Sequence, residues 1–449
     1  MSGIAELLAN LGYQVSGSDA KGSDVTERLS SLGVRVMRGH AAAHVGDADV
    51  VVVSSAIGPG NAEVAEARRR HVPVIPRAEM LAELMRLRYG IAIAGAHGKT
   101  TVTSMVALVL DRAGLDPTAV IGGRLSAFGS NARLGRGDYV VVEADESDRS
   151  FLKLSPSIAV ITNIDREHME SYGTWENLQT AFAEFANKVP FYGAVIACAD
   201  DKPVADLLPR IGRRVISYAL DAAADLQGHA LQLEAFGSTL AVRHRGPAGS
   251  RRELGTLRLR VPGRHNALNA LAATAVGVEV GIPFERIAPA LEEFRGAERR
   301  FQVRGEEHGV LVVDDYAHHP TEIAAVLAAS RAGIGRRVIA VFQPHRYSRT
   351  QQLLDAFGPA FAGADHVVLT DIYGAGEAPI PGVDGDALAR AIRQAITAPV
   401  DLVRALDDVP DAVAGISRPG DLVLTLGAGS IGALGDRILT TIRRKGLSA

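Results

Sequence analysis

The stretch that most constrains the fold is residues 91–104, where the apolar run Ile-Ala-Ile-Ala is followed by Gly-Ala-His-Gly-Lys-Thr-Thr. The apolar run over 91–94 predicts a buried strand, and the apolar spacing over 103–112 predicts a helix. Gly95 and Gly98 lack a Cβ and permit a tight turn between the two. The stretch therefore predicts an α/β unit with a glycine-rich turn between a strand and its helix.

The turn carries the side chains of a phosphate-binding loop. Free N–H groups and the helix dipole favour an anion at a helix N-terminus. Lys99 adds a positive charge, and a hydroxyl of Thr100 or Thr101 can reach Mg²⁺. The spacing is shorter than in the usual P-loop, because an isoleucine stands five residues before Gly98. We expect the phosphate chain of ATP here, and a turn that contains Gly-Lys-Thr by chance is the alternative.

Chain length and composition bound the number of domains and the kinds of partner. At 449 residues the chain is longer than one hydrophobic core usually serves, so we expect about three domains. The net charge of −3 gives no broad basic field for nucleic acid. Cys198 is the only cysteine, and neither a secretory signal nor a membrane-spanning apolar run is present. These features predict a cytoplasmic protein that is not inserted in a membrane.

Three successive α/β patterns predict domains at 1–88, 89–295 and 296–449. The first pattern opens with a helix at 6–11 and has no strand before it. Nucleotide-binding α/β domains normally open with a strand and a glycine-rich turn, so we expect that both are missing, through a misplaced start or a real truncation.

Predicted strands follow from short apolar runs between turn residues. In the first pattern they lie at 14–18, 35–37, 50–54 and 72–75. In the second they lie at 91–94, 139–143, 158–162, 194–197 and 214–218, followed by an antiparallel hairpin within 229–261. In the third they lie at 310–314, 337–342, 366–370 and 421–426.

Polar side chains follow two strands of the second pattern. Four carboxylates lie within 143–148, and hard cations prefer carboxylate oxygen, so a Mg²⁺ site is expected there with Glu143 as the first choice. His168 follows the next strand and is a candidate second ligand. Parallel strands would bring both beside the phosphate loop. A solvated acidic loop and an ordinary loop histidine are the alternatives.

Two polar clusters follow strands of the third pattern, one beginning Asp-Asp-Tyr-Ala-His-His-Pro and the other Gln-Pro-His-Arg-Tyr-Ser-Arg. In the second cluster, Arg346 and Arg349 can present guanidinium groups to a carboxylate or a phosphate. In the first, Asp315 or His318 can position an amine or carry a proton. Arg300, where two predicted domains join, can reach phosphate or belong to a solvated linker.

Three further residues have open interpretations. Asp19, after a strand of the first pattern, lies where an acidic residue often binds a ribose hydroxyl, and a solvated aspartate fits equally well. Asn266 and Asn269 lie near the start of a helix predicted over 263–281. Amide groups can bind an adenine edge, but capping is the commoner role for an asparagine there.

The ordered set of blocks resembles the Mur ligase family of ATP-dependent amide-forming enzymes. The matching blocks lie, in family order, at 1–6, 53–57, 95–101, 143–147, 163–172, 265–269, 314–320 and 345–350. The resemblance implies an N-terminal Rossmann-like domain for a UDP-sugar, here without its first strand and Gly-rich loop. It also implies a central P-loop ATPase-like α/β domain and a C-terminal Rossmann-like α/β domain that closes on both.

The resemblance also implies an activity and a set of site residues. The reaction is ATP-dependent joining of L-alanine to the carboxylate of UDP-N-acetylmuramate through an acyl phosphate, with Mg²⁺, in peptidoglycan precursor synthesis. The implied catalytic residues are Lys99, His318, Arg346 and Arg349. The implied nucleotide-binding residues are Gly95, His97, Gly98, Lys99, Thr100, Thr101, Asn266, Asn269 and Arg300. The implied substrate-binding residues are Ser2, Asp19, Ser54, Ser55, Asp315, Tyr316, His345, Arg346 and Arg349. The implied metal ligands are Thr100, Glu143 and His168.

Other activities stay open at this point. One is a recycling ligase that adds a whole tripeptide to the same UDP-sugar. From different classes, a P-loop switch or motor ATPase needs only the Lys-Thr-Thr turn, and a non-catalytic UDP-sugar binder is compatible with a truncated first domain. The sequence does not decide between a monomer and a homodimer, or among L-alanine, glycine and L-serine.

Overall fold

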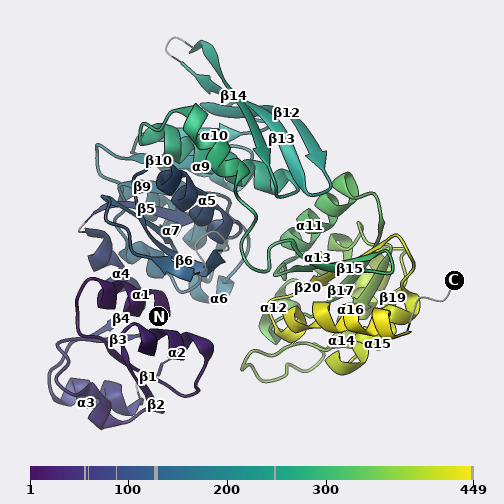
Figure 1. The fold of residues 1–449 in the computed structure, drawn as a ribbon, viewed down its shortest axis with the longest axis horizontal. Helices are drawn as coiled ribbons and strands as arrows, with labels where there is room; N and C mark the ends of the chain where they lie inside the picture. The colour runs from purple at the N-terminus through teal and green to yellow at the C-terminus, as the bar shows by residue number, and fades with distance from the viewer. Residues whose placement is uncertain (55–56, 59, 87, 126–129, 247–248, 446–449) are drawn as a thin grey trace. The chain divides into compact units, whose positions relative to one another are not determined.

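The computed structural model describes the chain apart from residues 55–56, 59, 87, 126–129, 247–248 and 446–449 (Figure 1). The chain divides into two compact units, each made of several segments. The first unit consists of Met1–His229, Ala241–Leu257 and Leu268–Glu292. The second consists of Ala230–Leu240, Arg258–Ala267 and Glu293–Ala449.

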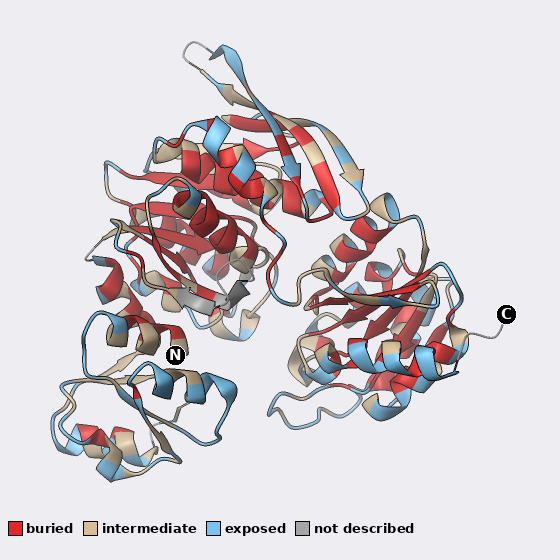
Figure 2. Cartoon of the chain, in the orientation of Figure 1, coloured by how far each residue is buried: buried red, intermediate tan, exposed pale blue. Residues whose placement is uncertain are grey.

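The N-terminal segment contains two short parallel sheets and four helices. Strand β1 (Ser16–Asp19) pairs with β2 (Arg35–Arg38), and β3 (Val51–Val53) pairs with β4 (Val74–Pro76). The helices are α1 (Ser2–Asn10), α2 (Asp24–Ser31), α3 (Ala62–Arg69) and α4 (Arg77–Arg86). Helix α1 begins before the predicted 6–11, because Ile4 and Leu7, one turn apart, are both buried. Elsewhere the segment is mostly half-buried or exposed (Figure 2), as expected for two-stranded sheets.

A ten-stranded sheet forms the centre of the chain, in the order β14-β13-β12-β11-β10-β9-β5-β8-β6-β7. Its strands are β5 (Tyr89–Ala94), β6 (Thr118–Leu125), β7 (Ser130–Arg133), β8 (Tyr139–Glu143), β9 (Ile158–Ile161), β10 (Ala194–Cys198), β11 (Val215–Ala219), β12 (Leu226–Glu234), β13 (Gly237–Arg245) and β14 (Arg251–Leu259). The two strands predicted to form a hairpin, β13 and β14, are neighbours in this sheet.

Strand β5 lies between β8 and β9 and is parallel to both, with Ile93 opposite Glu143 and Ala94 opposite Ile161. The segments that follow these three strands therefore leave the sheet at the same edge. Strands β5 and β9 are buried almost throughout, which explains their continuous apolar runs (Figure 2). This arrangement confirms the prediction that the phosphate loop and the two polar segments share one edge.

The helices of this part are α5 (Lys99–Arg112), α6 (Met169–Tyr172), α7 (Trp175–Asn187), α8 (Lys202–Leu207), α9 (Arg264–Glu279) and α10 (Phe284–Glu292). Helix α5 begins four residues before the predicted 103–112, directly after Gly98. The early start brings the lysine and both threonines of the motif into the first turn. Thr174 caps the start of helix α7, because its side chain accepts a hydrogen bond from the backbone N–H of Asn177 at 3.2 Å.

The C-terminal sheet has the order β15-β16-β20-β17-β18-β19, with β15 antiparallel to β16 and the other pairs parallel. Its strands are β15 (Gln302–Glu307), β16 (Val310–Asp315), β17 (Arg337–Phe342), β18 (His366–Leu369), β19 (Val400–Leu402) and β20 (Asp421–Leu426). Its helices are α11 (Pro320–Gly333), α12 (Tyr347–Gln352), α13 (Leu354–Ala360), α14 (Gly385–Ala395), α15 (Val409–Ile416) and α16 (Leu434–Lys445).

Both faces of this sheet are covered. Val338, Ala340 and Phe342 of β17 belong to one core cluster, and the alternate residues Ile339 and Val341 belong to another. Alternate side chains of a strand point to opposite faces, so helices pack on both. The doubly covered sheet confirms the predicted Rossmann-like α/β class. No helix within the described residues is long and apolar enough to cross a membrane.

Candidate active site

The turn between β5 and α5 depends on its two glycines. Gly95 and Gly98 have φ of 139° and 83°, values that favour glycine. A Cβ on Gly95 would lie 2.0 Å from Oγ1 of Thr162, and a Cβ on Gly98 would lie 2.6 Å from Oδ1 of Asn269. The first four N–H groups of a helix have no partner within the helix, so the start of α5 offers donors to an anion.

Lys99 lies at the first position of α5, and its ammonium is already well contacted. Nζ donates to the carbonyl oxygens of Gly95 at 2.6 Å and Ala96 at 3.2 Å, and to Oε1 of Glu146 at 2.8 Å. Burial alone would lower the pKa of Lys99, but the charge and hydrogen bond of Glu146 outweigh it and raise the pKa. Burial raises the pKa of Glu146 to about 7 against the opposing effect of Lys99.

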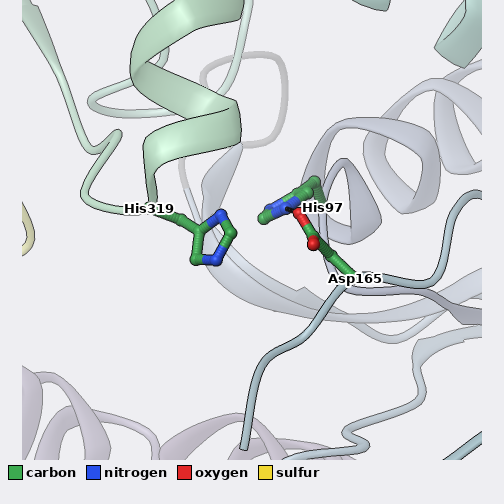
Figure 3. A group of neighbouring side chains, drawn as sticks. All are labelled: His97, Asp165 and His319. Carbon is green, nitrogen blue, oxygen red and sulfur yellow. Dashed lines mark hydrogen bonds and ion pairs between the residues drawn. The ribbon is translucent and has the colours of Figure 1, made fainter. Parts of the chain in front are cut away.

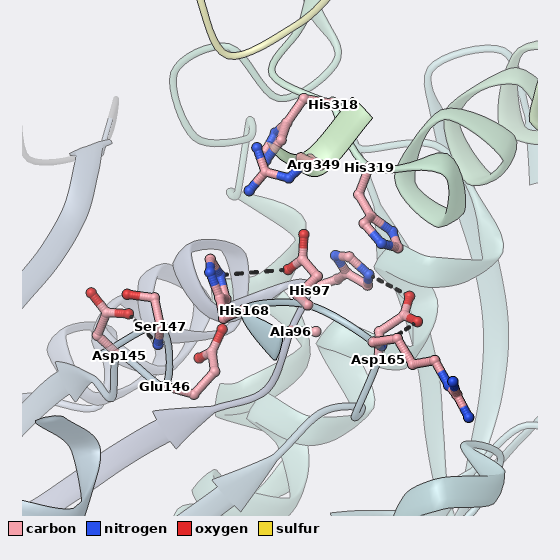
Figure 4. Close-up of polar contacts among 12 residues, drawn as sticks. Ala96, His97, Asp145, Glu146, Ser147, Asp165, His168, His318, His319 and Arg349 are labelled. Carbon is pink, nitrogen blue, oxygen red and sulfur yellow. Dashed lines mark hydrogen bonds and ion pairs between the residues drawn. The ribbon is translucent and has the colours of Figure 1, made fainter. Parts of the chain in front are cut away.

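Three side chains beside this pair could hold a cation. The ligand atoms of Glu146, Glu167 and His168 all lie within 4.8 Å of one another. Figure 4 shows Glu146 and His168 in the segments that follow β8 and β9. Oε2 of Glu146 is buried and has no hydrogen-bond partner among the residues that the structure describes. Because carboxylate oxygens are good ligands for Mg²⁺, the chemistry of this group fits a divalent cation.

Glu143, which the sequence favoured as the metal ligand, is the last residue of β8 and is not a member of this group. The chain turns after the strand, with the backbone N–H of Ser147 donating to Oδ1 of Asp145 at 3.0 Å. The hydroxyl of Tyr172 donates to the carbonyl of Glu146 at 2.5 Å and holds the turn. The sequence did not point to Glu146, because proximity to a strand end does not tell which acid turns inward, and the choice between Glu143 and this group stays a prediction.

The segment after β9 contacts the backbone and side chain of His97. Nε2 of His97 lies 2.9 Å from Oδ2 of Asp165 (Figure 3). Asn163 and Thr162 bond to the main chain of His97. His97 is thus held on both its ring and its backbone.

The two asparagines of α9 have different surroundings. Asn269 lies inside the helix, and its side chain meets Gly98 of the phosphate loop. It is therefore not an N-cap of this helix. Asn266 donates from Nδ2 to the carbonyl of Pro262 at 2.7 Å, which ties the start of α9 to the preceding turn. Asn266 is the third residue of α9, so this contact is not an N-cap hydrogen bond, and its role toward the nucleotide stays a prediction.

In the second unit, Asp315 at the end of β16 accepts hydrogen bonds from the backbone N–H groups of Phe301 at 2.7 Å and Ala317 at 2.8 Å. Burial raises its pKa to about 6, although Arg300 opposes the shift. The guanidinium of Arg300 lies 3.2 Å from Oε1 of Glu322 and 5.3 Å from the ring centroid of Tyr316.

Glu322 was not singled out in the sequence. Oε2 accepts from the backbone N–H groups of His318 and His319 at 3.1 and 3.3 Å, while Oε1 contacts Arg300. Glu322, three residues after the N-cap His319, completes a capping box, although histidine replaces the Ser or Thr of the usual sequence signature. The carboxylate therefore joins two predicted site residues and starts α11.

The histidine and arginine candidates of this unit form a second cluster. The rings of His318 and His345 are 5.9 Å apart, and Nη1 of Arg349 lies 3.3 Å from Nδ1 of His345. Burial, reinforced by His318, Arg349 and Arg346, lowers the pKa of His345 to about 4. Arg346 has φ of 72°, precedes α12 and lies 3.9 Å from Glu377. His345 is consequently a neutral donor and acceptor near pH 7.

The described candidates of the N-terminal segment lie at the ends of helices and strands. Ser2 is the first residue of α1, and Ser54 directly follows β3. Asp19 is the last residue of β1, is exposed, and accepts a hydrogen bond from the backbone N–H of Lys21 at 3.0 Å. This local contact fits a solvated aspartate, and ribose binding stays a prediction. Ser55 lies outside the described residues.

Family models match nearly the whole chain. The model of the Mur ligase family, catalytic domain, matches residues 1–89, the Mur ligase middle domain matches 93–277, and the Mur ligase, glutamate ligase domain, matches 299–429. The order of the three matches is the order of the sequence blocks that suggested the family.

Relatives match at full length. The UDP-N-acetylmuramate–L-alanine ligase of Geobacter sp. (strain M21) is 52% identical over 444 residues, which cover 99% of this chain and 95% of that protein. The enzyme of the same name from Anaeromyxobacter sp. (strain Fw109-5) is 55% identical over 446 residues, covering 98% and 94%.

Solved structures agree with the sequence matches. The UDP-N-acetylmuramate-alanine ligase of Thermotoga maritima superposes with a TM-score of 0.80 at 28% identity, covering 99% of this chain and 96% of that one. The murein peptide ligase of Psychrobacter arcticus gives 0.69 at 25% identity, covering 100% and 97%. The resemblance drawn from the sequence blocks is thus confirmed, and the chain belongs to the Mur ligase family.

Proposed function

We propose that the chain joins L-alanine to the carboxylate of UDP-N-acetylmuramate with conversion of ATP to ADP and phosphate, in the cytoplasmic synthesis of peptidoglycan precursors. The observation that carries this proposal is the full-length identity, above 50%, to relatives named for that reaction. The site chemistry supports it. An edge of the ten-stranded sheet carries a phosphate loop, and an edge of the C-terminal sheet carries histidines and arginines suited to anionic substrates.

The phosphate chain of ATP binds, in this proposal, at the start of α5. The N–H groups there, the ammonium of Lys99 and the hydroxyls of Thr100 and Thr101 supply donors and charge. Lys99 moves from the carbonyls of the loop to the phosphates, and its raised pKa keeps it charged. Asn269, beside Gly98, faces the nucleotide.

Mg²⁺ is held by Glu146, Glu167 and His168 in this proposal, with Thr100 and the predicted Glu143 as further candidates. The unpartnered, buried Oε2 of Glu146 supports the assignment. When bound, the cation supplies neutralisation of charge on the phosphate oxygens. Lys99 donates to Oε1 of Glu146 in this structure. With phosphate bound, Lys99 would keep this hydrogen bond or exchange it for one to a phosphate oxygen.

The reaction then proceeds in two displacements. A carboxylate oxygen of the sugar attacks the γ-phosphorus and ADP leaves, which gives an acyl phosphate. The amine of L-alanine attacks the acyl carbon, phosphate leaves, and the amine loses its proton. Positioning and charge stabilisation are the main requirements of the first displacement.

We assign the second cluster to the anionic groups of the substrates. Arg346 and Arg349 present guanidinium groups, and Arg300 with Asp315 and Tyr316 lines the end of β16. Neutral His345 accepts from Arg349 at Nδ1, which leaves Nε2–H as a donor in the tautomer that this contact implies. His318 is the adjacent imidazole and a candidate to receive the proton of the amine.

The predicted division at 1–88, 89–295 and 296–449 gives these roles to a UDP-sugar domain, a nucleotide domain and an amino-acid domain. The family models, which change between 89 and 93 and between 277 and 299, support that division. Ser2, Asp19, Ser54 and Ser55 are the proposed contacts of the first domain with the UDP-sugar.

A phosphate-release assay with single omissions tests the reaction. Purified protein with Mg²⁺, ATP, UDP-N-acetylmuramate and L-alanine should release phosphate, and omission of any one component should abolish release. Glycine and L-serine in place of L-alanine measure selectivity. Release that needs a tripeptide instead of L-alanine would identify a recycling ligase, release without the UDP-sugar would identify an ATPase, and binding without release would identify a UDP-sugar binder.

A further inference from the structure

Asn163, directly after β9 and its neighbour Thr162, uses both ends of its amide on one residue of the phosphate loop. Oδ1 accepts the backbone N–H of His97 at 2.8 Å, and Nδ2 donates to the carbonyl of His97 at 2.9 Å. The backbone carbonyl of Asn163 also accepts the N–H of Ala96 at 3.2 Å. Asn163 thus fixes three successive peptide groups of the loop.

Thr162 adds a second donor to the same carbonyl. Its Oγ1 donates to the carbonyl of His97 at 2.7 Å, and the side chain is buried. The same oxygen would lie 2.0 Å from a Cβ on Gly95, so the close approach of β9 to the loop requires glycine there. A carbonyl with two donors from one direction cannot rotate without loss of both.

The orientation of this carbonyl determines the orientation of the next N–H. The peptide group between His97 and Gly98 is planar and trans, so its N–H points opposite to its C=O. Because the C=O of His97 is directed at Thr162 and Asn163, the N–H of Gly98 is directed away from them. Gly98 immediately precedes α5, whose first N–H groups are the donors available to an anion.

We infer that Asn163, assisted by Thr162, is a positioning residue that sets the phosphate loop for ATP. This inference rests on the proposed function for the identity of the ligand. Asn163 does not need to touch ATP, because it acts through the peptide groups of His97. Its loss should weaken ATP binding and leave the binding of L-alanine unchanged.

Asn187 at the end of α7 provides a matched control. Its Oδ1 accepts the N–H of Gly212 at 2.8 Å, and its Nδ2 donates to the carbonyls of Ala183 and Arg210 at 2.9 and 3.0 Å. Both asparagines are half-buried, and within the described part of the chain their side-chain amides form hydrogen bonds to main-chain N–H and C=O groups. Asn187→Ala therefore removes the same kind of interaction at a place without a phosphate loop.

The test compares wild type, Asn163→Ala and Asn187→Ala in the phosphate-release assay, and measures the Kd of each protein for MgATP by calorimetry. Loss of the amide should raise KM and Kd for ATP by about tenfold, the value of one to two hydrogen bonds, with KM for L-alanine within about twofold of wild type. Asn187→Ala should lower the melting temperature and leave both ATP constants unchanged.

Thr162→Val and Thr162→Ser separate positioning from folding. Valine keeps the shape and loses the donor, whereas serine keeps the hydroxyl, so only Thr162→Val should raise the ATP constants, and serine should restore them. Unchanged ATP constants in Asn163→Ala, or equal changes in Asn187→Ala, would overturn the inference. A wild-type protein that binds MgATP but releases no phosphate with L-alanine would contradict the proposed function alone. The calorimetric comparison would still test the positioning role of Asn163.

Discussion

The carboxyl edges of the two large sheets carry site residues of opposite character. At the central edge, after β5, β8 and β9, one lysine lies among carboxylates, with Lys99 at 2.8 Å from Glu146 and with Glu167 nearby. At the C-terminal edge, after β16 and β17, imidazole and guanidinium groups dominate, with Arg349 at 3.3 Å from His345. The same topology therefore supports two different kinds of ligand.

The difference lies in the charged neighbours of Glu146 at one edge and of His345 at the other. Burial raises the pKa of Glu146 to about 7, and Lys99 is the main influence against this shift, so an added cation would stabilise the charged form of Glu146. Burial and cationic neighbours lower the pKa of His345 to about 4, so that edge gains from an added anion. The central edge therefore suits a metal-bound polyphosphate, and the C-terminal edge suits a carboxylate.

The largest effect should come from removal of the cation at the central edge. Lys99→Ala should lower kcat/KM for ATP by about 100-fold or more in the phosphate-release assay, as loss of one preorganised charge typically does. Lys153→Ala is the control, because Lys153 forms an exposed pair with Glu79 at 3.1 Å and should leave turnover unchanged. Equal turnover in Lys99→Ala and wild type would remove the phosphate loop from the active site.

The next largest effect should come from Glu146. Glu146→Gln keeps the shape of the side chain and removes its charge, so the Mg²⁺ concentration for half-maximal rate should rise by roughly tenfold or more, given that even outer partners of a metal site are worth about 10- to 100-fold. Glu79→Gln, which removes the charge of the exposed pair, should not change it. A Mg²⁺ dependence that shifts only in Glu143→Gln would favour the residue chosen from the sequence.

These two residues show how far the sequence could lead. Lys99 was found because a phosphate loop is a local pattern in which the strand, the glycines and the helix start are consecutive. Glu146 was not chosen, because four acids lie at the end of β8 and just after it, and the turn there decides which one is buried. Asp145 and Tyr172 from α6 close this turn. A contact from a residue more than twenty positions away leaves no trace in the local pattern.

The same reasoning explains the rest of the fold. Strands β8, β17 and β20 agree with their predicted bounds, because a buried strand is a continuous apolar run between turns. The predicted starts of α1 and α5 are late, since Ser2 and Gly3 in α1 and Lys99 to Thr101 in α5 are small or polar and carry no apolar periodicity. Glu322 was visible only as a capping residue, and its contact with Arg300 depends on tertiary structure.

At the C-terminal edge, Arg349→Lys tests whether a planar guanidinium is needed. Lysine keeps the charge but offers no fork, so kcat/KM for the UDP-sugar should fall by about tenfold, the value of roughly one charge-assisted hydrogen bond. Arg331→Lys is the matched control within the same unit, because Arg331 pairs with Asp365 at 2.7 Å on the surface. A lysine variant with full activity would show that this edge supplies charge without geometry.

The smallest effects should appear in stability as a function of pH, and they should have opposite sign for a buried acid of the central edge and a buried imidazole of the C-terminal edge. Asp201, after β10 at the central edge, has a pKa raised by burial to about 6, above the usual 3.8 of an aspartate. The folded state then binds more protons than the unfolded state between pH 4 and 6, so this group stabilises below about pH 4 and its contribution is lost as pH rises through 6. Asp201→Asn should remove that loss.

His345 should act in the other direction. Its folded pKa of about 4 lies below the usual 6.5, so the unfolded state binds more protons between these values, and stability is present above 6.5 and lost as pH falls through 4. In melting curves from pH 4 to 7, the difference between wild type and Asp201→Asn should therefore fall with pH, and the difference between wild type and His345→Gln should rise. Slopes of the same sign would contradict the burial of a neutral acid at the central edge and a neutral imidazole at the C-terminal edge.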